Sequence, residues 1–576
     1  MPDTAERKGK IMKKRKMMTI ALMAAAMSVF FTGCLGGRSD GEDSVYEGTT
    51  GEAGAEGSAP EMAVQETAAA SQIGGPAMIS ESIAVIDGYA PVPGNDFGAG
   101  EEYNSIQENG FLSVREYPLS TFSADVDTAS YSNIRRMINR GEEIPEDAVR
   151  IEEMINYFSY DYEQPQGEEP LAVTAELSDC PWNEDSQLLL LGIQGKAVDF
   201  EDRPMSNLVF LLDVSGSMYS PDKLPLVQKS FGLLIDELTE NDRVSIVTYA
   251  GYEQVLLEGV TGDHKAQIRE AIDSLQAGGS TAGEAGINRA YEIGEKYFIQ
   301  GGNNRVILAT DGDLNVGVSS EEELTKLIEE KRESGIHLSV LGFGTGNIKD
   351  NKLEALADNG DGNYAYIDSL MEAKKVLADE MGGTLLTIAK DVKIQVEFNP
   401  AQVAGYRLIG YENRALADED FADDSVDAGE IGSGHRVTVL YELIRDEEKM
   451  PQQELKYQSK EGSEDAREGK DTGVEGRENP YGDELLTMSI RYKEPDGDES
   501  RLMSVPVKED IYNAGMSPNM IWAGAVAETG MILRDSRYKG TSDWESVLDL
   551  IGSMPESSMD DYRDDFRLLV LKVSDR

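Results

Sequence analysis

The sequence contains few of the side chains that enzymes most often use for catalysis. Its 576 residues include three histidines, His264, His337 and His435, and two cysteines, Cys34 and Cys180. No histidine has a nucleophile at a recognised motif spacing, and neither an H-E-x-x-H zinc motif nor a G-x-x-x-x-G-K-[ST] phosphate loop is present. Two cysteines allow one disulfide at most, so packing must hold the fold together. We therefore expect a binding protein rather than an enzyme.

Basic residues are also scarce. The chain has 53 Lys and Arg against 107 Asp and Glu, which gives a formal net charge of -54 at pH 7. Proteins that bind nucleic acids use clustered Lys and Arg to displace the counterions of the phosphates. The composition therefore argues against nucleic acid as a partner and favours cations or basic partners.

The N-terminus has the organisation of an export signal. Seven basic residues between Arg7 and Lys16 precede the apolar run 17–31, which ends in Thr32-Gly33-Cys34. This order resembles a bacterial lipoprotein signal, which implies that residues 1–33 are removed and that Cys34 carries a lipid. The protein would then lie outside the cytoplasm, anchored to the cell membrane or envelope. The alternative is an uncleaved membrane anchor, because the apolar run approaches spanning length.

The lipid would leave Cys180 without a disulfide partner. No histidine or cysteine lies near Cys180 in the sequence to support catalysis. We expect it to be a buried structural thiol.

Composition and periodicity divide the remainder of the chain. Residues 34–115 are rich in Gly, Ala, Ser and Glu, which predicts a flexible acidic linker. We expect an N-terminal flanking α+β region at 116–204 and a C-terminal region at 386–576 that is first β-rich and then helical. Because strands flank the centre on both sides, we predict that they pair into one sandwich or sheet into which the central domain is inserted.

The central region, 205–385, alternates apolar strands with amphipathic helices. This alternation predicts an α/β domain with a doubly wound, mostly parallel sheet. The helix expected after residue 223 has one apolar stripe that should face the sheet. The expected strands are 208–212, 243–249, 255–257, 305–310, 337–342 and 364–367.

Three oxygen-rich segments lie in loops of this domain. Asp213-Val214-Ser215-Gly216-Ser217 follows the first strand, and Thr310-Asp311-Gly312 follows a later one. Gly278-Gly279-Ser280-Thr281 lies in a loop between helical segments. The first segment alone is a weak signal, because Asp, Ser and Gly are common in turns. Together, carboxylates and hydroxyls gathered by such loops suit a hard divalent cation.

In order, spacing and strand context, these segments resemble the metal ion-dependent adhesion site of the von Willebrand factor type A domain, which has a Rossmann-like fold. The resemblance implies one Mg²⁺, or Ca²⁺ or Mn²⁺, bound directly or through water. Ser280 competes with Thr281 as the hydroxyl of the second loop, and Asp313 is expected in the outer shell. The implied ligands are Asp213, Ser215, Ser217, Thr281 and Asp311.

The wider chain is similar to bacterial surface proteins that carry such a domain. The similarity covers most of residues 119–576 and is visible in the segments 121–133, 150–158 and 406–413. It implies a protein ligand, of unknown identity, whose acidic side chain completes the metal shell. The alternative is a structural or assembly scaffold of the envelope in which the metal ion is mainly structural.

Two other polar segments allow competing interpretations. Asp125-Val126-Asp127-Thr128 is either a second cation loop or, as we favour, the N-cap cluster of a helix that begins at Ala129. The Gly-rich segment 358–363 resembles a calcium loop in composition but lacks the closing acidic residue. A turn before the next strand explains it more simply.

Overall fold

The computed structural model describes the chain from residue 101 to the C-terminus with several gaps. Cys34 and its signal, Asp125, Thr281 and Asp313 lie outside the described residues, as does most of the predicted linker. The described residues are 101, 103–124, 127–198, 203–280, 283–312, 321–346, 349–380, 386–426, 428–451, 481–495, 497 and 499–576.

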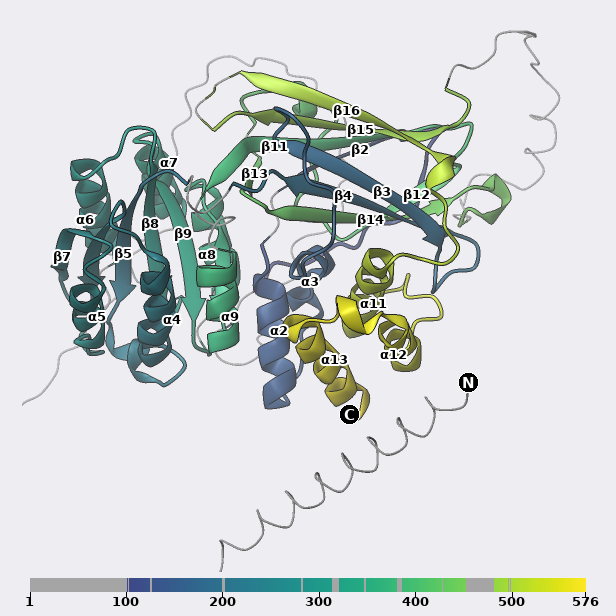
Figure 1. The fold of residues 1–576 in the computed structure, drawn as a ribbon. Coiled ribbons are helices and arrows are strands. Elements are labelled where there is room, and N and C mark those ends of the chain that lie inside the picture. The colour runs from purple at the N-terminus through teal and green to yellow at the C-terminus, as the bar shows by residue number, and fades with distance from the viewer. Residues whose placement is uncertain are drawn as a thin grey trace, which may run out of the picture. The chain divides into compact units, whose positions relative to one another are not determined.

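The central domain contains the predicted six-stranded sheet (Figure 1). Its order is β10-β9-β8-β5-β6-β7, and every neighbouring pair is parallel except β6 and β7. The strands are β5 Ser206–Asp213, β6 Arg243–Tyr249, β7 Glu253–Thr261, β8 Asn303–Thr310, β9 His337–Phe343 and β10 Tyr364–Ile367.

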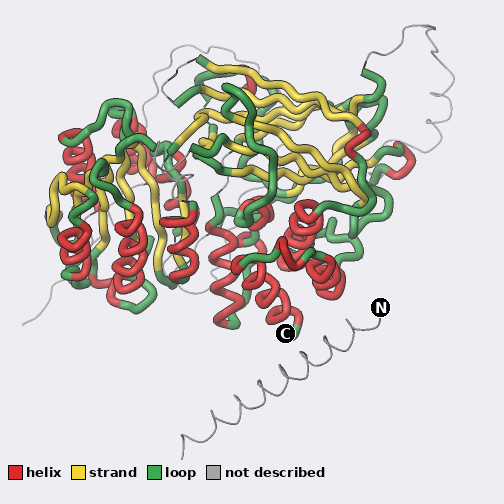
Figure 2. The backbone as a smooth tube through the Cα atoms, in the orientation of Figure 1, coloured by secondary structure: helices red, strands yellow, loops and turns green. Residues whose placement is uncertain are grey.

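Helices cover both faces of this sheet, which confirms the doubly wound α/β fold (Figure 2). Alternate residues of β5 belong to different cores: Phe210 packs with Phe231 of α4, whereas Val209 shares a core with Ile287 of α6. The helices are α4 Leu224–Glu237, α5 Lys265–Asp273, α6 Gly283–Lys296, α7 Glu321–Arg332, α8 Asp350–Asp358 and α9 Leu370–Lys374, which continues as the π-helix η4 Lys375–Asp379.

The two flanking regions build one β-sandwich, as predicted. β4 pairs antiparallel with β14, and β2 pairs antiparallel with β11, so each sheet contains strands from both sides of the central domain. One sheet has the order β1-β12-β14-β4-β3, and β11 joins β2, β13 and β15 in the other. The strands are β1 Leu112–Ser113, β2 Leu119–Ser123, β3 Leu171–Asp179, β4 Gln187–Gly195, β11 Thr387–Phe398, β12 Gly405–Ile409, β13 Gly429–Gly432, β14 Arg436–Ile444, β15 Glu484–Lys493 and β16 Ser500–Lys508.

A group of helices packs on the outer face of the β4–β14 sheet. Phe158, Trp522 and Phe566 form its centre, with each pair of ring centroids 5.1–5.4 Å apart, and Leu190 and Leu440 of the sheet join the same core. These contacts bury large aromatic surfaces from both flanking regions together. The helices are α2 Ala129–Arg140, η1 Glu146–Ala148, α3 Ile151–Asn156, α11 Pro518–Leu533, α12 Trp544–Ser553 and α13 Asp561–Ser574.

The packed part of the chain begins earlier than the sequence predicts. Residues 103–115, which we assigned to the linker, contact the flanking regions. Val114 is buried, Asn109 donates a hydrogen bond to the carbonyl of Gly410 at 2.8 Å, and Leu112 pairs with Tyr406. The segment contains Ile106, Phe111, Leu112 and Val114, and its partners lie about three hundred residues away in the sequence. The local sequence therefore does not reveal these partners.

The free energy of unfolding depends on pH through Glu528, which lies in the middle of α11. Its side chain is fully buried and accepts a hydrogen bond from Ser546 Oγ at 2.8 Å, and burial raises its pKa to about 7. The folded state therefore keeps a proton that the unfolded chain loses above its ordinary pKa of about 4.5. Stability contributed by this group is present at low pH and is lost as the pH rises towards 7 and beyond.

We expect Glu528→Gln to remove this loss of stability at higher pH. Between pH 5 and pH 8 the wild type should lose about 2 kcal/mol more unfolding free energy than the variant, as measured by urea denaturation. Glu545→Gln, an exposed change on α12, is the matched control and should keep the wild-type difference. Equal pH dependence of wild type and Glu528→Gln would contradict the prediction.

Candidate metal centre

The D-x-S-x-S segment begins at the carboxyl end of β5, a central strand of the sheet. Asp213 is fully buried there, and its Oδ1 accepts a hydrogen bond from the backbone N–H of Ser215 at 2.8 Å. The hydroxyls of Ser215 and Ser217 lie 2.9 Å apart, and Ser217 is exposed. The short loop thus gathers one carboxylate and two hydroxyls, and it leaves one of the hydroxyls facing solvent.

The second carboxylate comes from the neighbouring strand. β8 pairs with β5 in parallel, so that Asp311 directly follows β8 at the same edge of the sheet as Asp213. Both aspartates are buried, and burial together with the charge of Asp311 raises the pKa of Asp213 to about 6. Burial and mutual repulsion disfavour the charged form of two carboxylates at one edge of the sheet. A positive charge between or beside them stabilises that form.

Two buried hydroxyl groups hold the carboxylate of Asp213 in its orientation. Tyr249, at the end of β6, and Thr310, at the end of β8, each donate a hydrogen bond to Asp213 Oδ2 at 3.2 Å. From the sequence we named Thr310 only as part of the segment before Gly312, and we identified neither its role nor Tyr249. Each lies at the carboxyl end of a strand adjacent to β5, and this position is the signal that could have revealed them.

The 278–280 loop lies against the β5 loop. Gly278 N–H donates to the carbonyl of Val214 at 2.8 Å, and Gly216 N–H donates to the carbonyl of Gly279 at 3.1 Å. Gly279 has a φ of +88°, a conformation that favours glycine. Thr281, the predicted ligand of this loop, lies outside the described residues, whereas Ser280 is described and exposed. The choice between these two hydroxyls stays open.

The residues present fit a hard divalent cation. Asp213, Asp311, Ser215 and Ser217 offer only oxygen atoms, the ligands that Mg²⁺, Ca²⁺ and Mn²⁺ prefer. No group of three or more His, Cys, Asp or Glu arranged to hold a metal is found among the described residues, as expected for a set that mixes two carboxylates with hydroxyls. The proposed ligand set remains a prediction, and four of its five members lie on the adjacent loops after β5 and β8.

One side chain in the centre was not anticipated. Lys223, immediately before α4, donates a hydrogen bond from Nζ to Asp311 Oδ2 at 2.8 Å, and both side chains are buried. The two residues are 88 positions apart in the sequence. No local pattern marks a lysine as the partner of a distant aspartate.

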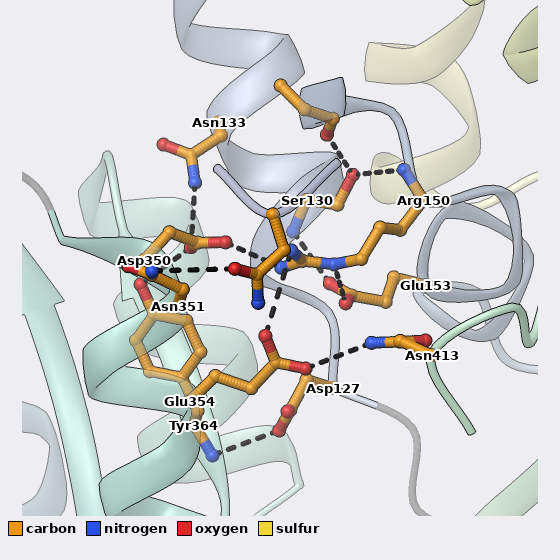
Figure 3. A network of polar contacts seen from close by, with 12 residues as sticks. Asp127, Ser130, Asn133, Arg150, Glu153, Asp350, Asn351, Glu354, Tyr364 and Asn413 are labelled. Carbon is orange, nitrogen blue, oxygen red and sulfur yellow. Dashed lines mark hydrogen bonds and ion pairs between the residues drawn. The ribbon is translucent and has the colours of Figure 1, made fainter. Parts of the chain in front are cut away.

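Asp127 is neither a described metal ligand nor an N-cap. It accepts a hydrogen bond from the backbone N–H of Tyr364 at 3.0 Å (Figure 3). It accepts another from Arg414 at 3.1 Å. Helix α2 does begin at Ala129, but Thr128 makes no side-chain capping bond. The segment therefore ties the N-terminal flank to β10 and to the C-terminal flank, and our N-cap interpretation is wrong for Asp127.

Two other sequence interpretations are confirmed by burial and backbone geometry, and a third residue, His337, is also described by its burial. Residues 358–363 form the turn before β10, with Asp361 at a φ of +49°. Cys180 is a buried thiol whose pKa burial raises well above its ordinary value. Burial also lowers the pKa of His337 to about 3, so this histidine is neutral at physiological pH.

Buried arginines of the flanking regions hold the helices α8 and α9 of the central domain. Arg150 contacts Glu153 of its own helix and, across the domain boundary, Asp350 Oδ2 at 2.7 Å (Figure 3). Arg135 and Arg414 make further cross-domain pairs. These involve Asp368 and Glu372 for Arg135, and Glu354 and Asp358 for Arg414. The central domain is therefore fixed to the flanks by buried ion pairs.

The fold and the oxygen set define a protein of the von Willebrand factor type A domain class. The family described as von Willebrand factor type A domain matches residues 207–379, and the one described as von Willebrand factor matches 98–190. The family described as "Uncharacterized protein YfbK, C-terminal" matches 383–575. The YfbK protein of Escherichia coli K12 is 43% identical over 475 residues, 81% of this chain and 80% of the relative. The chain therefore belongs to the YfbK family of bacterial proteins with a type A domain.

Other proteins match parts of this chain at lower identity. Human inter-alpha-trypsin inhibitor heavy chain H3 is 27% identical over 195 residues, 31% of this chain and 21% of the relative. A solved von Willebrand factor type A protein from Catenulispora acidiphila is 15% identical, with a TM-score of 0.38 over 71% of this chain and 98% of that one. The mussel byssus proximal thread matrix protein 1 is 23% identical, with a TM-score of 0.26 over 33% and 46% of the two chains, and in that structure zinc occupies the adhesion-site motif.

Proposed function

We propose that this protein is an envelope-anchored binding protein that engages a protein ligand through a divalent ion. The ion is held by Asp213, Ser215, Ser217 and Asp311 together with a hydroxyl of the 280–281 segment. The observation that carries the proposal is the gathering of two buried carboxylates and two hydroxyls on the adjacent loops after β5 and β8, with Ser217 exposed.

The donor set leaves the ion able to accept a further oxygen. Two carboxylates and three neutral hydroxyls do not fill the six oxygen positions that Mg²⁺ prefers, and the hydroxyls do not reduce its charge. An exposed carboxylate of a partner protein would supply the missing ligand with a strong charge-assisted contact. The role of this chain's residues is to hold the ion at the surface and to keep Asp213 oriented through Tyr249 and Thr310.

Anchoring through Cys34 is part of the same proposal. The basic, apolar and small residues before Cys34 support export and lipidation. None of the helices in the described part of the chain is long and apolar enough to cross a membrane.

A capture experiment tests ligand binding. Full-length protein immobilised on beads is expected to retain a protein from envelope extract in Mg²⁺, and to release it with EDTA or with excess free glutamate but not with excess lysine. Ser217→Ala removes one exposed metal ligand and should abolish capture, because the ion then loses a ligand beside the partner. The matched control Ser504→Ala, exposed on β16, should capture normally. Capture that persists in EDTA would rule out the proposal.

A scaffold role for the metal is the second candidate, and one contact favours it. Arg140, at the end of α2, donates to Asp222 at 3.1 Å and to Thr345 at 3.0 Å, so the flanking region contacts loops beside the metal centre. A structural ion would raise the melting temperature of the protein without any metal-dependent capture. Metal-dependent capture together with this stabilisation favours the ligand-binding role.

A further inference from the structure

The lysine in the metal centre is held in one position by its surroundings. Lys223 caps the start of α4, where its carbonyl accepts the N–H groups of Leu226 at 2.8 Å and Val227 at 2.9 Å. Its side chain is buried, and its Nζ reaches Asp311 Oδ2. The ammonium is therefore directed at a predicted metal ligand by a fixed backbone.

The absence of a side chain at Gly344 leaves the space that the Lys223 side chain occupies. A Cβ at Gly344 would lie 2.3 Å from Lys223 Cγ and 2.4 Å from its Cε, closer than atoms can approach. Gly344 also has a φ of +78°, which disfavours other residues. Any larger residue after β9 would push the lysine away from Asp311. The loop is thus shaped around the lysine stem.

The N-terminal flank supports the loops on both sides of the lysine. Asp222, the residue before it, accepts a hydrogen bond from Arg140 of α2 at 3.1 Å. The same arginine donates to Thr345, the residue after Gly344, at 3.0 Å. A cavity of about 150 Å³ lined by Arg140, Asp222 and Gly344 lies at this contact, next to the loop that carries Lys223.

We propose that Lys223 is an internal cation that competes with the divalent ion for Asp311, and that this competition sets the metal affinity of the centre. The proposal rests on the metal site of the proposed function. An ammonium bound to Asp311 neutralises one of the two buried carboxylates when no metal is present. A divalent ion that approaches the same oxygens meets the repulsion of a buried positive charge, and Asp311 can become its ligand only as the lysine withdraws.

The competition predicts tighter metal binding once the lysine charge is removed. Isothermal titration of full-length Lys223→Met with MgCl₂ is expected to give a Kd lower than that of the wild type by about tenfold or more. Lys223→Gln, which keeps a hydrogen-bond donor without the charge, should behave in the same way. The matched control Lys229→Met removes an exposed charge from the same helix and should leave the Kd unchanged.

Stability without metal gives a second readout. In EDTA, Lys223→Met should melt at a lower temperature than the wild type, because Asp213 and Asp311 lose their counter-ion, and Mg²⁺ should raise its melting temperature by a larger amount. Folded variants whose Kd is unchanged or higher would overturn the competition while leaving the metal site intact. Failure of both wild type and variants to bind Mg²⁺, Ca²⁺ or Mn²⁺ would overturn the metal site and the competition together.

Discussion

Asp213→Asn is expected to weaken Mg²⁺ binding by more than about a hundredfold, because even residues that only support metal ligands are worth roughly ten- to a hundredfold in affinity. Asp213 is the buried carboxylate at the centre of the site, and three hydrogen bonds orient it. Asparagine has the same shape but lacks the charge that attracts the ion. Isothermal titration with MgCl₂ measures the effect.

The same substitution should not unfold the protein. In metal-free buffer, loss of one of two neighbouring buried carboxylates removes repulsion, so the melting temperature of Asp213→Asn should equal or exceed that of the wild type. Asp273→Asn, an exposed change at the end of α5, is the matched control for the titration. Wild-type affinity in a folded Asp213→Asn protein would show that the ion binds elsewhere.

Arg150→Met should lower the free energy of unfolding by about 3–5 kcal/mol, the usual result of removing one partner of a buried ion pair. The Arg150 side chain is 6% exposed and lies next to Glu153, Asp350 and Glu354, which are also buried. Methionine fills a similar volume, but it leaves Glu153 and Asp350 without the charge that stabilises them, whereas Glu354 keeps its ion pair with Arg414. The boundary between the central domain and the N-terminal flank should therefore lose stability, although Arg135 still pairs with Asp368 and Glu372.

Denaturation by guanidinium chloride, followed by circular dichroism, measures this loss. The matched control is Arg115→Met, which breaks an ion pair with Glu447 in which both side chains are 67% exposed. Exposed pairs contribute about 0–1 kcal/mol, so the control should be close to the wild type. A similar small loss in Arg150→Met would mean that the buried ion pairs do not hold the domains together.

The sequence predicted those parts of the fold that are encoded by nearby residues. The apolar run before Asp213 and the one before Thr310 are strands because both are continuously apolar, as strands buried on two faces must be. The helix predicted to begin at Ala129 is α2, and Gly141 ends it in a left-handed conformation. Helix α13 lies in the C-terminal region that was predicted to be helical, and Asp560 marks its start by accepting the N–H of Arg563 at 2.8 Å.

The residues of the candidate site also fall into two groups, those that nearby sequence predicts and those that depend on distant contacts. Asp213, Ser215 and Ser217 fall within five residues, and Asp311 follows a clear strand, so motif and strand order were sufficient to bring them together. Lys223 and Arg140 were not predicted, because their partners depend on how loops and domains pack across the fold. Long charged side chains reach in many directions, and periodicity does not specify which distant residue each one contacts.

The pairing of β4 with β14 imposes an order on folding. These strands lie on opposite sides of the whole type A domain in the sequence, and so do β2 and β11. During synthesis, β3 and β4 are made before the type A domain and β14. The edge of β4 that pairs with β14 therefore stays unpaired until β14 has been synthesised. A type A domain that folds first brings the two halves of the sandwich close together and shortens the loop that must close. The inserted domain would thus bring together two halves of the sandwich that lie far apart in the sequence.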